Sequence, residues 1–264
     1  MQLDQIIIYP IKSCAGIELE NSLVENRGFP MDRRWMLIES DGMFVSQRNS
    51  PQLSLIESKI TESQILVNYP GMDQLGINIG SSDRGLIKTT IWDDQVKALS
   101  VCSEADNWFT KVLNRRIRLV YMNDVVTRPL VKDRLPKDQS FELSFADGFP
   151  YLLTNQASLD DLNQRLVDPV KIDRFRPNLN VSGFEPFEED KWKLISIGDV
   201  KFQVVKPCAR CHVTTIDQNT AQSSHEPLKT LARYRKYENQ VLFGMNLVAL
   251  NSGSVSINDP VIIL

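Results

Sequence analysis

The sequence lacks an apolar run of the length that a membrane-spanning segment requires. Such a helix needs about 20 consecutive apolar residues, and no stretch of the 264 residues approaches this length. The first ten residues also lack the basic start, the long apolar stretch and the small-residue cleavage site of a secretory signal. We therefore expect a cytoplasmic protein without a membrane span.

The chain also has no excess of positive charge, and it has few cysteines. With 30 Lys and Arg against 33 Asp and Glu, the net charge is −3, which gives no general attraction to nucleic acid or anionic membranes. Any bound anion must therefore be held by a local basic cluster. The four cysteines are expected to be thiols, ligands or core residues, because the cytoplasm does not favour structural disulfides. The glycine-rich G-x-G-x-x-G turn of dinucleotide-binding folds is absent.

Short apolar or alternating runs, separated by turn residues, fill the first half of the chain. Asp41 and Gly42 form a typical hairpin turn between two of them. A helix is expected at residues 104–113, with Ser103 as its N-cap. The regular spacing of the runs favours a β-barrel or sandwich. The expected strands are residues 3–8, 17–24, 34–38, 44–47, 53–57, 65–69, 75–79 and 85–91.

The second half begins with a polar stretch at residues 123–139, which we interpret as a linker or a lid. A capped amphipathic helix is expected at residues 157–167. Further expected elements are a hairpin at 195–205, a strand at 213–217, a short helix at 227–235 and strands at 247–251, 254–257 and 261–264. We predict a mostly β, β-barrel-like fold with a few helices, in two β-rich domains.

The strongest chemical signal is the segment 207–212, which contains Cys208, Arg210, Cys211 and His212. It matches the C-x-x-C-H attachment motif of c-type haem, but that attachment normally requires export. A zinc site would need two more ligands, and a thioredoxin-like pair would need a helix after the first cysteine. Two buried cysteines without a role are a further interpretation. We favour a single-thiolate metal site, because a neighbouring cation such as Arg210 stabilises a thiolate.

A second polar segment, residues 173–178, contains Arg174, Arg176 and Asn178 beside a proline that favours an extended backbone. Arginine presents planar donors that suit phosphate or a polar heterocycle. Asparagine offers both a donor and an acceptor to the edge of a pterin-like ring. The alternative is a surface loop that contains an ordinary salt bridge.

A third segment, residues 9–16, places Lys12 and Ser13 at the end of the first expected strand, and Gly16 permits a tight turn after them. Such a turn can bind an anion. The alternative is a solvated turn without a ligand. Arg33 follows in a short charged segment, residues 32–35.

Together and in this order, these segments resemble the MOSC-domain family, most closely the branch with the mitochondrial amidoxime reducing component and its bacterial relatives. The resemblance covers nearly the whole chain. It implies an N-terminal MOSC-type β-barrel domain at residues 1–122 and a MOSC domain at residues 123–264. The segments that carry it are 9–13, 32–35, 145–150, 157–163, 173–178, 208–211, 242–244 and 259–261.

The resemblance implies a molybdenum cofactor with a single pterin dithiolene, with Cys211 as the protein ligand to molybdenum and the catalytic residue. Its anchoring positions correspond to Lys12, Ser13, Arg33, Arg176, Asn178 and Arg210. The first three would hold the phosphate, and Arg176 and Asn178 would hold the pterin. Two residues depart from the animal relatives: Ala209 replaces a serine, and His212 replaces an aliphatic residue. His212 would either tune the site or be a packed strand residue.

The function implied by the resemblance is the reduction of small N-hydroxylated compounds, such as amidoximes and N-hydroxylated bases. The chain ends directly after its last expected strand, and its cysteines do not form a typical iron–sulfur cluster pattern. We therefore expect electrons from a separate flavin reductase, ferredoxin-like or cytochrome b5-like protein. The alternative hypothesis is a carrier or sulfur-transfer protein that binds the cofactor without turnover, because both functions require the same anchoring residues.

Overall fold

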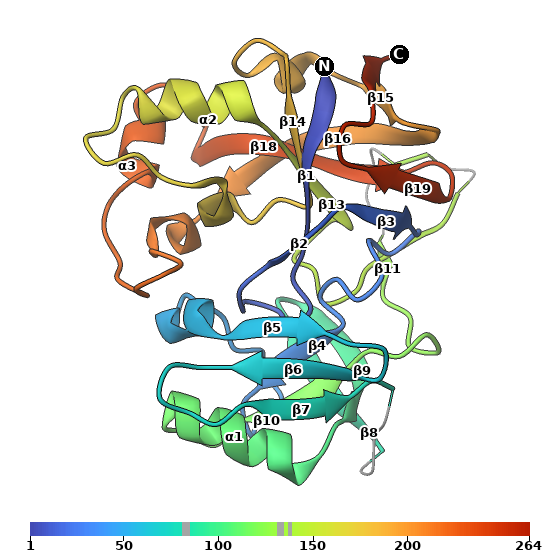
Figure 1. Cartoon of the computed structure of the whole chain (residues 1–264), viewed down its shortest axis with the longest axis vertical. Helices are drawn as coiled ribbons and strands as arrows, with labels where there is room; N and C mark the ends of the chain where they lie inside the picture. The colour runs from blue at the N-terminus through green and yellow to red at the C-terminus, as the bar shows by residue number, and fades with distance from the viewer. Residues whose placement is uncertain (81–84, 131–134, 137–138) are drawn as a thin grey trace.

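The computed structural model describes residues 1–80, 85–130, 135–136 and 139–264, and it confirms the predicted mostly β fold. Two β-rich bodies are stacked along the long axis (Figure 1). The large body contains a nine-stranded sheet, and the small body contains a four-stranded and a three-stranded sheet. Within the described ranges, each helix is too short or too polar to cross a membrane.

The nine-stranded sheet of the large body is mostly antiparallel, but β13 (Tyr151–Asn155) and β14 (Leu179–Ser182) run parallel. Helix α2 (Gln156–Asn163) lies in the connection between these two strands. The remaining strands of this sheet are β2 (Ile17–Leu19), β1 (Gln2–Ile8), β18 (Gln240–Ala249), β16 (Val200–Arg210), β15 (Leu194–Ile197), β20 (Val261–Ile263) and β17 (Lys236–Tyr237).

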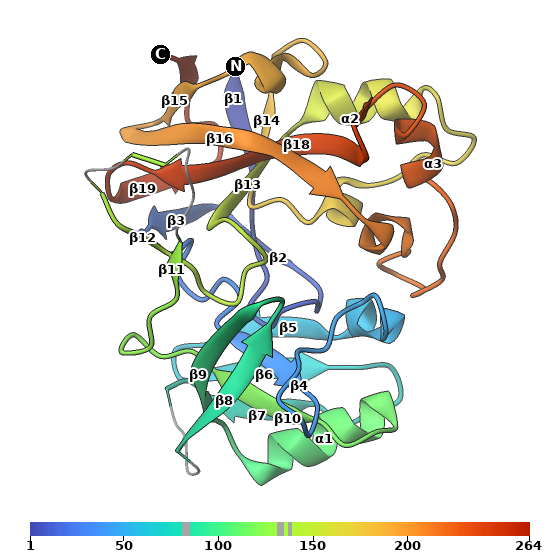
Figure 2. The same ribbon diagram turned by 180° about the vertical axis from the view of Figure 1, so that it is seen from behind.

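The small body places α1 (Ser103–Leu113) beside its two sheets (Figure 2). Trp35, Trp108 and Phe109 belong to its buried core. The four-stranded sheet has the order β4 (Trp35–Ile38), β10 (Arg118–Tyr121), β9 (Asp94–Ser100) and β8 (Leu86–Ile91). The three-stranded sheet has the order β5 (Glu57–Ile60), β6 (Gln64–Asn68) and β7 (Leu75–Asn78).

The first strands of the chain lie in the large body rather than in the small one. Strand β1 pairs with β14 and β2, and β3 (Asn21–Val24) pairs with β19 (Gly253–Ser256). Another two-stranded sheet joins β11 (Pro129–Leu130) to β12 (Phe141–Glu142). The domain division between residues 122 and 123 stays a prediction. The nine-stranded sheet contains strands from both sides of that division.

Several expected elements differ in the structure. The expected strand 17–24 is divided into β2 and β3, and residues 44–47 contribute only a single bridge between Phe44 and Ile38. Residues 53–57 begin in the 3-10 helix η1 (Pro51–Leu55), which Pro51 favours at its start. The other 3-10 helices are η2 (Ile172–Phe175), η3 (Glu188–Lys191) and η4 (His212–Thr215).

The segment after Cys211 forms η4 instead of the expected strand. Thr214 and Thr215 donate their hydroxyls to the carbonyls of Cys211 and His212, at 3.0 and 2.8 Å. Such local side-chain bonds compete with the hydrogen bonds of a strand.

The ends of the three α-helices in the described residues also differ from the expected ones. Cys102 replaces Ser103 as the N-cap of α1, and no side-chain bond caps that end. The expected helix 157–167 is capped, by Asn155, but it ends at Asn163, four residues early, where the Asn163 amide pairs with the backbone of Val170. The short helix at 227–235 is reduced to α3 (Leu228–Leu231). Part of the expected loop at 123–139 lies outside the described residues.

Two neighbouring residues of β18 make close contacts, one with the segment that precedes Arg176 and one with β13. Phe243 stacks on Phe175 of η2, with the ring centroids 4.0 Å apart. The next residue, Gly244, has φ +75°, and a Cβ there would lie 2.6 Å from the carbonyl oxygen of Leu153. Only glycine therefore permits this close approach of β18 to β13.

We expect Phe243→Ala to lower the free energy of unfolding by about 3–5 kcal/mol, because it removes a fully buried ring and leaves a cavity. Denaturant unfolding of the variant and wild type measures the loss. Val167→Ala, at a 97% exposed position, is the control and should change stability by less than about 0.5 kcal/mol. Equal stability of wild type and Phe243→Ala would contradict the role assigned to the stack.

The buried Glu189 gives a prediction for pH dependence. Its carboxylate accepts from Asn155 and Ser158 at 3.0 and 2.8 Å, and burial raises its pKa above the ordinary 4.5. The stability from this group is therefore complete below pH 4.5 and is lost as pH rises through the folded-state value. Glu189→Gln should gain stability relative to wild type between pH 4 and pH 8 in denaturant unfolding. A difference in unfolding free energy between the two proteins that stays constant with pH would contradict this prediction.

Candidate cofactor-binding site

A cavity of about 270 Å³ lies where the end of β16 meets the loops of both bodies. All seven site residues predicted from the sequence line it, although they come from four separate segments of the chain. These residues are Lys12, Ser13, Arg33, Arg176, Asn178, Arg210 and Cys211. The fold therefore brings together the four segments that the sequence singled out.

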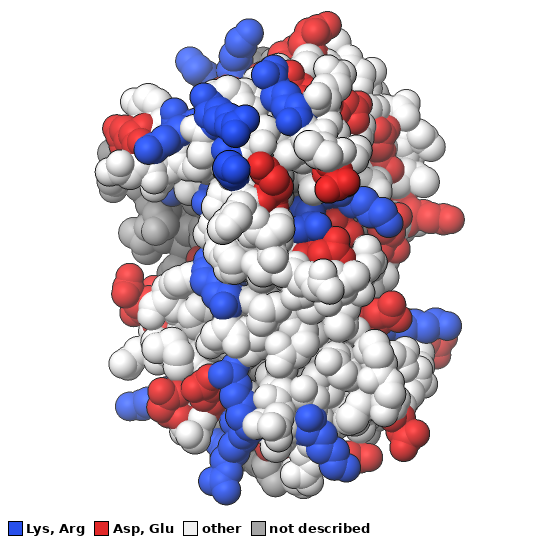
Figure 3. All heavy atoms as spheres, turned by 90° about the vertical axis from the view of Figure 1, so that its left-hand side faces the viewer, with Lys and Arg blue, Asp and Glu red and all other residues white. Residues whose placement is uncertain are grey.

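The charge of this cavity is strongly positive. Among its described lining residues, one carboxylate, Asp147, faces five cations. On the face shown in Figure 3, by contrast, acidic and basic side chains are mixed. The five cations are Lys12, Arg33, Arg48, Arg176 and Arg210.

A second and larger cavity, of about 610 Å³, shares Arg176 with the first. Its lining has no cysteine, and its carboxylates, those of Glu18, Glu57 and Asp173, outnumber its one arginine. The smaller cavity is therefore the one that suits an anion and a soft metal.

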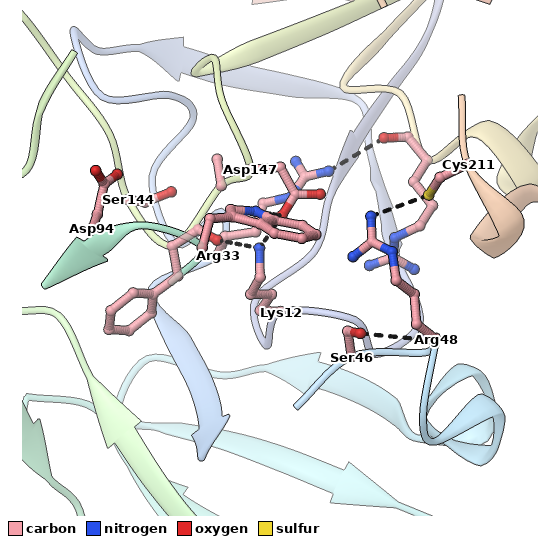
Figure 4. Close-up of polar contacts among 12 residues, drawn as sticks. Lys12, Arg33, Ser46, Arg48, Asp94, Ser144, Asp147 and Cys211 are labelled. Carbon is pink, nitrogen blue, oxygen red and sulfur yellow. Dashed lines mark hydrogen bonds and ion pairs between the residues drawn. The ribbon is translucent and has the colours of Figure 1, made fainter. Parts of the chain in front are cut away.

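Lys12 is buried and already has an anionic neighbour. Its ammonium donates to the carbonyl of Phe145 at 2.8 Å and to the carboxylate of Asp147 at 2.5 Å (Figure 4). Burial lowers the pKa of Lys12, while Asp147 opposes that change. Burial also disfavours ionisation of Asp147, but Lys12 outweighs it and holds the pKa of that carboxyl below its usual range. An anion that reaches Lys12 must share it with Asp147.

Ser13 follows Lys12 with φ +71°, in the left-handed region. Gln47 of the small body donates to the carbonyl of Ser13 at 2.8 Å and exchanges hydrogen bonds with Gln218 at 3.0 and 3.1 Å. The turn that carries Lys12 and Ser13 is therefore fixed by both bodies.

Arg33 is held by a network of acceptors. One guanidinium nitrogen donates to Asp32 at 2.6 Å and to the side-chain oxygen of Asn178 at 3.0 Å, and the other donates to the carbonyl of Arg176 at 3.2 Å. Burial lowers the pKa of Arg33, but Asp32 outweighs it and the pKa is raised. The Arg33 cation is thus permanent and fixed in direction.

Asn178 contributes mainly by positioning Arg33. Its side chain is 2% exposed. Besides Arg33, its oxygen accepts from the backbone of Leu152 at 3.3 Å, and its amide donates to the carbonyl of Ile7 at 3.1 Å. Little of the amide edge remains for a pterin, so direct contact between Asn178 and that ring stays a prediction.

Arg176 has no carboxylate partner among the described residues. Its guanidinium lies 4.2 Å from the centre of the Tyr9 ring, and that of Arg33 lies 4.4 Å from the same ring. Burial lowers the pKa of Arg176 and raises the pKa of the Tyr9 phenol. Two cations around one neutral ring leave positive charge that an anionic ligand can neutralise.

The two arginines near the thiols have partners that the sequence did not indicate. Arg210 donates to Cys208 at 3.0 Å and to the carbonyl of Phe175 at 2.6 Å, whereas Arg48 donates to Cys211 at 3.1 Å (Figure 4). The expected support of the Cys211 thiolate by Arg210 is therefore replaced by Arg48. Because Arg48 is 163 positions from Cys211, local sequence gave no signal for it.

His212 and the other cysteines do not add metal ligands to the cavity. His212 is outside the lining of the cavity, and its ring contacts the hydroxyls of Thr215 and Ser223 at 3.1 and 3.2 Å. All four cysteines are free, and burial raises the pKa of Cys14 to about 12. Among the described residues, no three His, Cys, Asp or Glu side chains are grouped as metal ligands.

Comparison with known proteins gives the family. A model of the MOSC N-terminal beta barrel domain matches residues 1–116, and a model of the MOSC domain matches residues 140–262. The chain is 34% identical to mitochondrial amidoxime reducing component 2 of Rattus norvegicus, over 98% of this chain and 82% of that protein.

Two further relatives also match nearly the whole of this chain. The component 2 of Homo sapiens is 34% identical over 96% of this chain and 81% of that protein. Molybdenum cofactor sulfurase of Oryza sativa is 31% identical over 94% of this chain, but over only 32% of its own length. By both domain matches and by these relatives, the chain belongs to the MOSC-domain family, in the branch that contains the mitochondrial amidoxime reducing components.

Proposed function

We propose that this chain is a molybdenum cofactor-dependent oxidoreductase that reduces small N-hydroxylated compounds with electrons from a separate donor protein. The family and the relatives associate the chain with the molybdenum cofactor. The observation that carries the proposal is the meeting of two free thiols, Cys208 and the candidate ligand Cys211, with five cations in a single cavity. A thiolate suits a soft metal, and the cations suit a phosphate.

The residues present fit such a group. The Nε of Arg210 is buried without a hydrogen-bond partner, and Arg176 has no carboxylate among the described residues. A buried donor without an acceptor is costly unless a ligand supplies one. A phosphate and a polar heterocycle, bound beside these arginines, would provide the missing acceptors.

We assign a role to each part of the cavity. Lys12, Ser13 and Arg33 would hold the phosphate, Arg176 and Arg210 the pterin, and Cys211 the metal. When bound, the cofactor supplies two-electron oxygen-atom transfer. The chain itself supplies one soft ligand and a set of preorganised donors, and burial strengthens their attraction for an anion because the local dielectric is low.

The second candidate is a carrier or sulfur-transfer protein that binds the cofactor without turnover. The similarity to molybdenum cofactor sulfurase favours it, but this chain corresponds to about a third of that protein. The amidoxime reducing components match over more than four fifths of their length, so we prefer the reductase. The donor is proposed as a flavin reductase, a ferredoxin-like or a cytochrome b5-like protein, and the location as the cytoplasm.

Purified protein from cells able to make the cofactor should contain molybdenum and released pterin, with little zinc or haem. It should reduce benzamidoxime with a reconstituted donor chain or a chemical reductant, and not with NADH alone. Elemental analysis and product chromatography measure both. Stoichiometric zinc without molybdenum would contradict the proposal. Full molybdenum loading without turnover, with any donor, would instead support the carrier.

The two cysteines near the end of β16 separate a single-thiolate site from paired-cysteine sites. Cys211→Ser replaces a soft ligand with a hard one, so activity should fall by more than about a hundredfold, while pterin is retained through Lys12, Arg33 and Arg176. The matched variant, Cys208→Ser, should keep molybdenum and most of the activity, because the Cys208 sulfur contacts Arg210 and the Ala209 carbonyl and is not the proposed metal ligand. Metal content and reductase activity are measured for both. Complete loss in both variants would overturn the single-ligand assignment.

A further inference from the structure

Arg48 differs from the other four cations of the cavity. Lys12 is paired with Asp147, Arg33 with Asp32, and Arg210 donates to Cys208 and Phe175, while Arg176 lies against Tyr9. Arg48 comes from the small body, is exposed, and has the Cys211 sulfur as its one side-chain hydrogen-bond acceptor in the described part of the chain. It is therefore the cation that a molecule arriving at Cys211 would meet first.

Trp92 holds the Arg48 guanidinium in place. The two groups lie face to face, with the guanidinium carbon 4.4 Å from the ring centre. Trp92 has φ +54°, in the left-handed region that a bulky residue rarely adopts. Its indole donates to Asp147 at 3.2 Å, and its ring contacts Phe44 with centroids 5.0 Å apart. Arg48 thus lies on an aromatic ring that is itself held by Asp147 and Phe44.

We propose that Arg48 recognises the oxygen of the substrate N–O group, and that its charge selects neutral or anionic N-oxygenated substrates over cationic molecules. This inference rests on the proposed reductase function. A guanidinium offers several N–H donors in one plane. One of them reaches the Cys211 sulfur at 3.1 Å. The others have no side-chain acceptor among the described residues, so they remain for an oxygen of a molecule that binds beside Cys211.

The chemistry of the reaction explains why a fixed cation is useful there. In the reduction of an amidoxime the N–O bond breaks, two electrons arrive from the donor protein and two protons from water, and the oxygen leaves as water. Negative charge grows on the oxygen as that bond breaks, so a preorganised donor aimed at it stabilises the transition state. The amidine product is a strong base and takes up a further proton. Arg48 repels the resulting cation and so favours its release.

The test compares holoenzyme variants of Arg48. Arg48→Gln removes the charge, Arg48→Lys keeps the charge without the planar donors, and Arg118→Gln is the control, because it removes a positive charge from β10 outside the cavity. Molybdenum and pterin content, kcat and KM for benzamidoxime, and calorimetric binding of the cation benzamidine are measured for each variant.

We expect Arg48→Gln to retain the cofactor, to lower kcat/KM for benzamidoxime roughly ten- to hundredfold, and to bind benzamidine more tightly than wild type. Arg48→Lys should keep weak benzamidine binding but lose part of the rate. Arg118→Gln should match wild type. A purely structural role would not strengthen the binding of a cation.

Two outcomes would overturn the inference. Loss of molybdenum from Arg48→Gln would assign Arg48 to the cofactor, and equal benzamidine binding in wild type and Arg48→Gln would exclude charge selection. If wild type holds molybdenum but reduces nothing, the proposed function fails. The comparison of benzamidine binding then still decides whether Arg48 controls which charge the site admits.

Discussion

The buried ion pair between Asp32 and Arg33 is the interaction on which the rest of the site depends. Asp32 also accepts from the backbone of Tyr9 at 2.7 Å, and the backbone of Arg33 donates to the Tyr9 carbonyl at 2.8 Å. The pair therefore fastens the entry to the small body against the end of β1. Removing one partner of such a buried pair typically costs about 3–5 kcal/mol, because the other charge is left uncompensated. Asn178 completes the network by accepting from Arg33.

Both bodies contribute residues to the cavity. The large body supplies the thiols at the end of β16 and the arginines near η2, and the small body supplies Arg48 and its support, Trp92. The Cys211 sulfur is thus held by one body and faced by a cation of the other. The distance between them, 3.1 Å, depends on how the two bodies are packed, which is a property of the whole chain.

The sequence was most informative where the hydrophobic pattern was regular. The runs that became β1, β6, β7 and β8 alternate or remain apolar over several residues, and period-two patterning is a strong signal for strands. Strands β9 and β10 were missed because their apolar runs are short and lie on either side of helix α1. The pattern after Cys211 predicts a strand because β-branched residues favour strands, whereas in the structure two threonine hydroxyls donate to nearby carbonyls instead.

For the site, the residue types and their order predicted which side chains would meet, and all seven line one cavity. Contacts between residues far apart in the sequence could not be predicted from local patterns. Nothing near position 211 indicates Arg48, and nothing near Asn178 indicates that its amide is already occupied by Arg33, Leu152 and Ile7. Such contacts are determined by tertiary packing, which a local pattern does not encode.

The pairing of β1 with β14 and of β3 with β19 has a consequence for the order of folding. The sheets of the small body use only residues 35–121, so this body can form while the remainder of the chain is still being synthesised. The large sheet must wait, because β1 has no central neighbour until β14 appears and β13 has none on its other side until β18 appears. Contacts over such sequence distances form slowly. Cys211, between β16 and β18, is therefore enclosed only when nearly the whole chain has been made, and the cavity is among the last parts of the molecule to take shape.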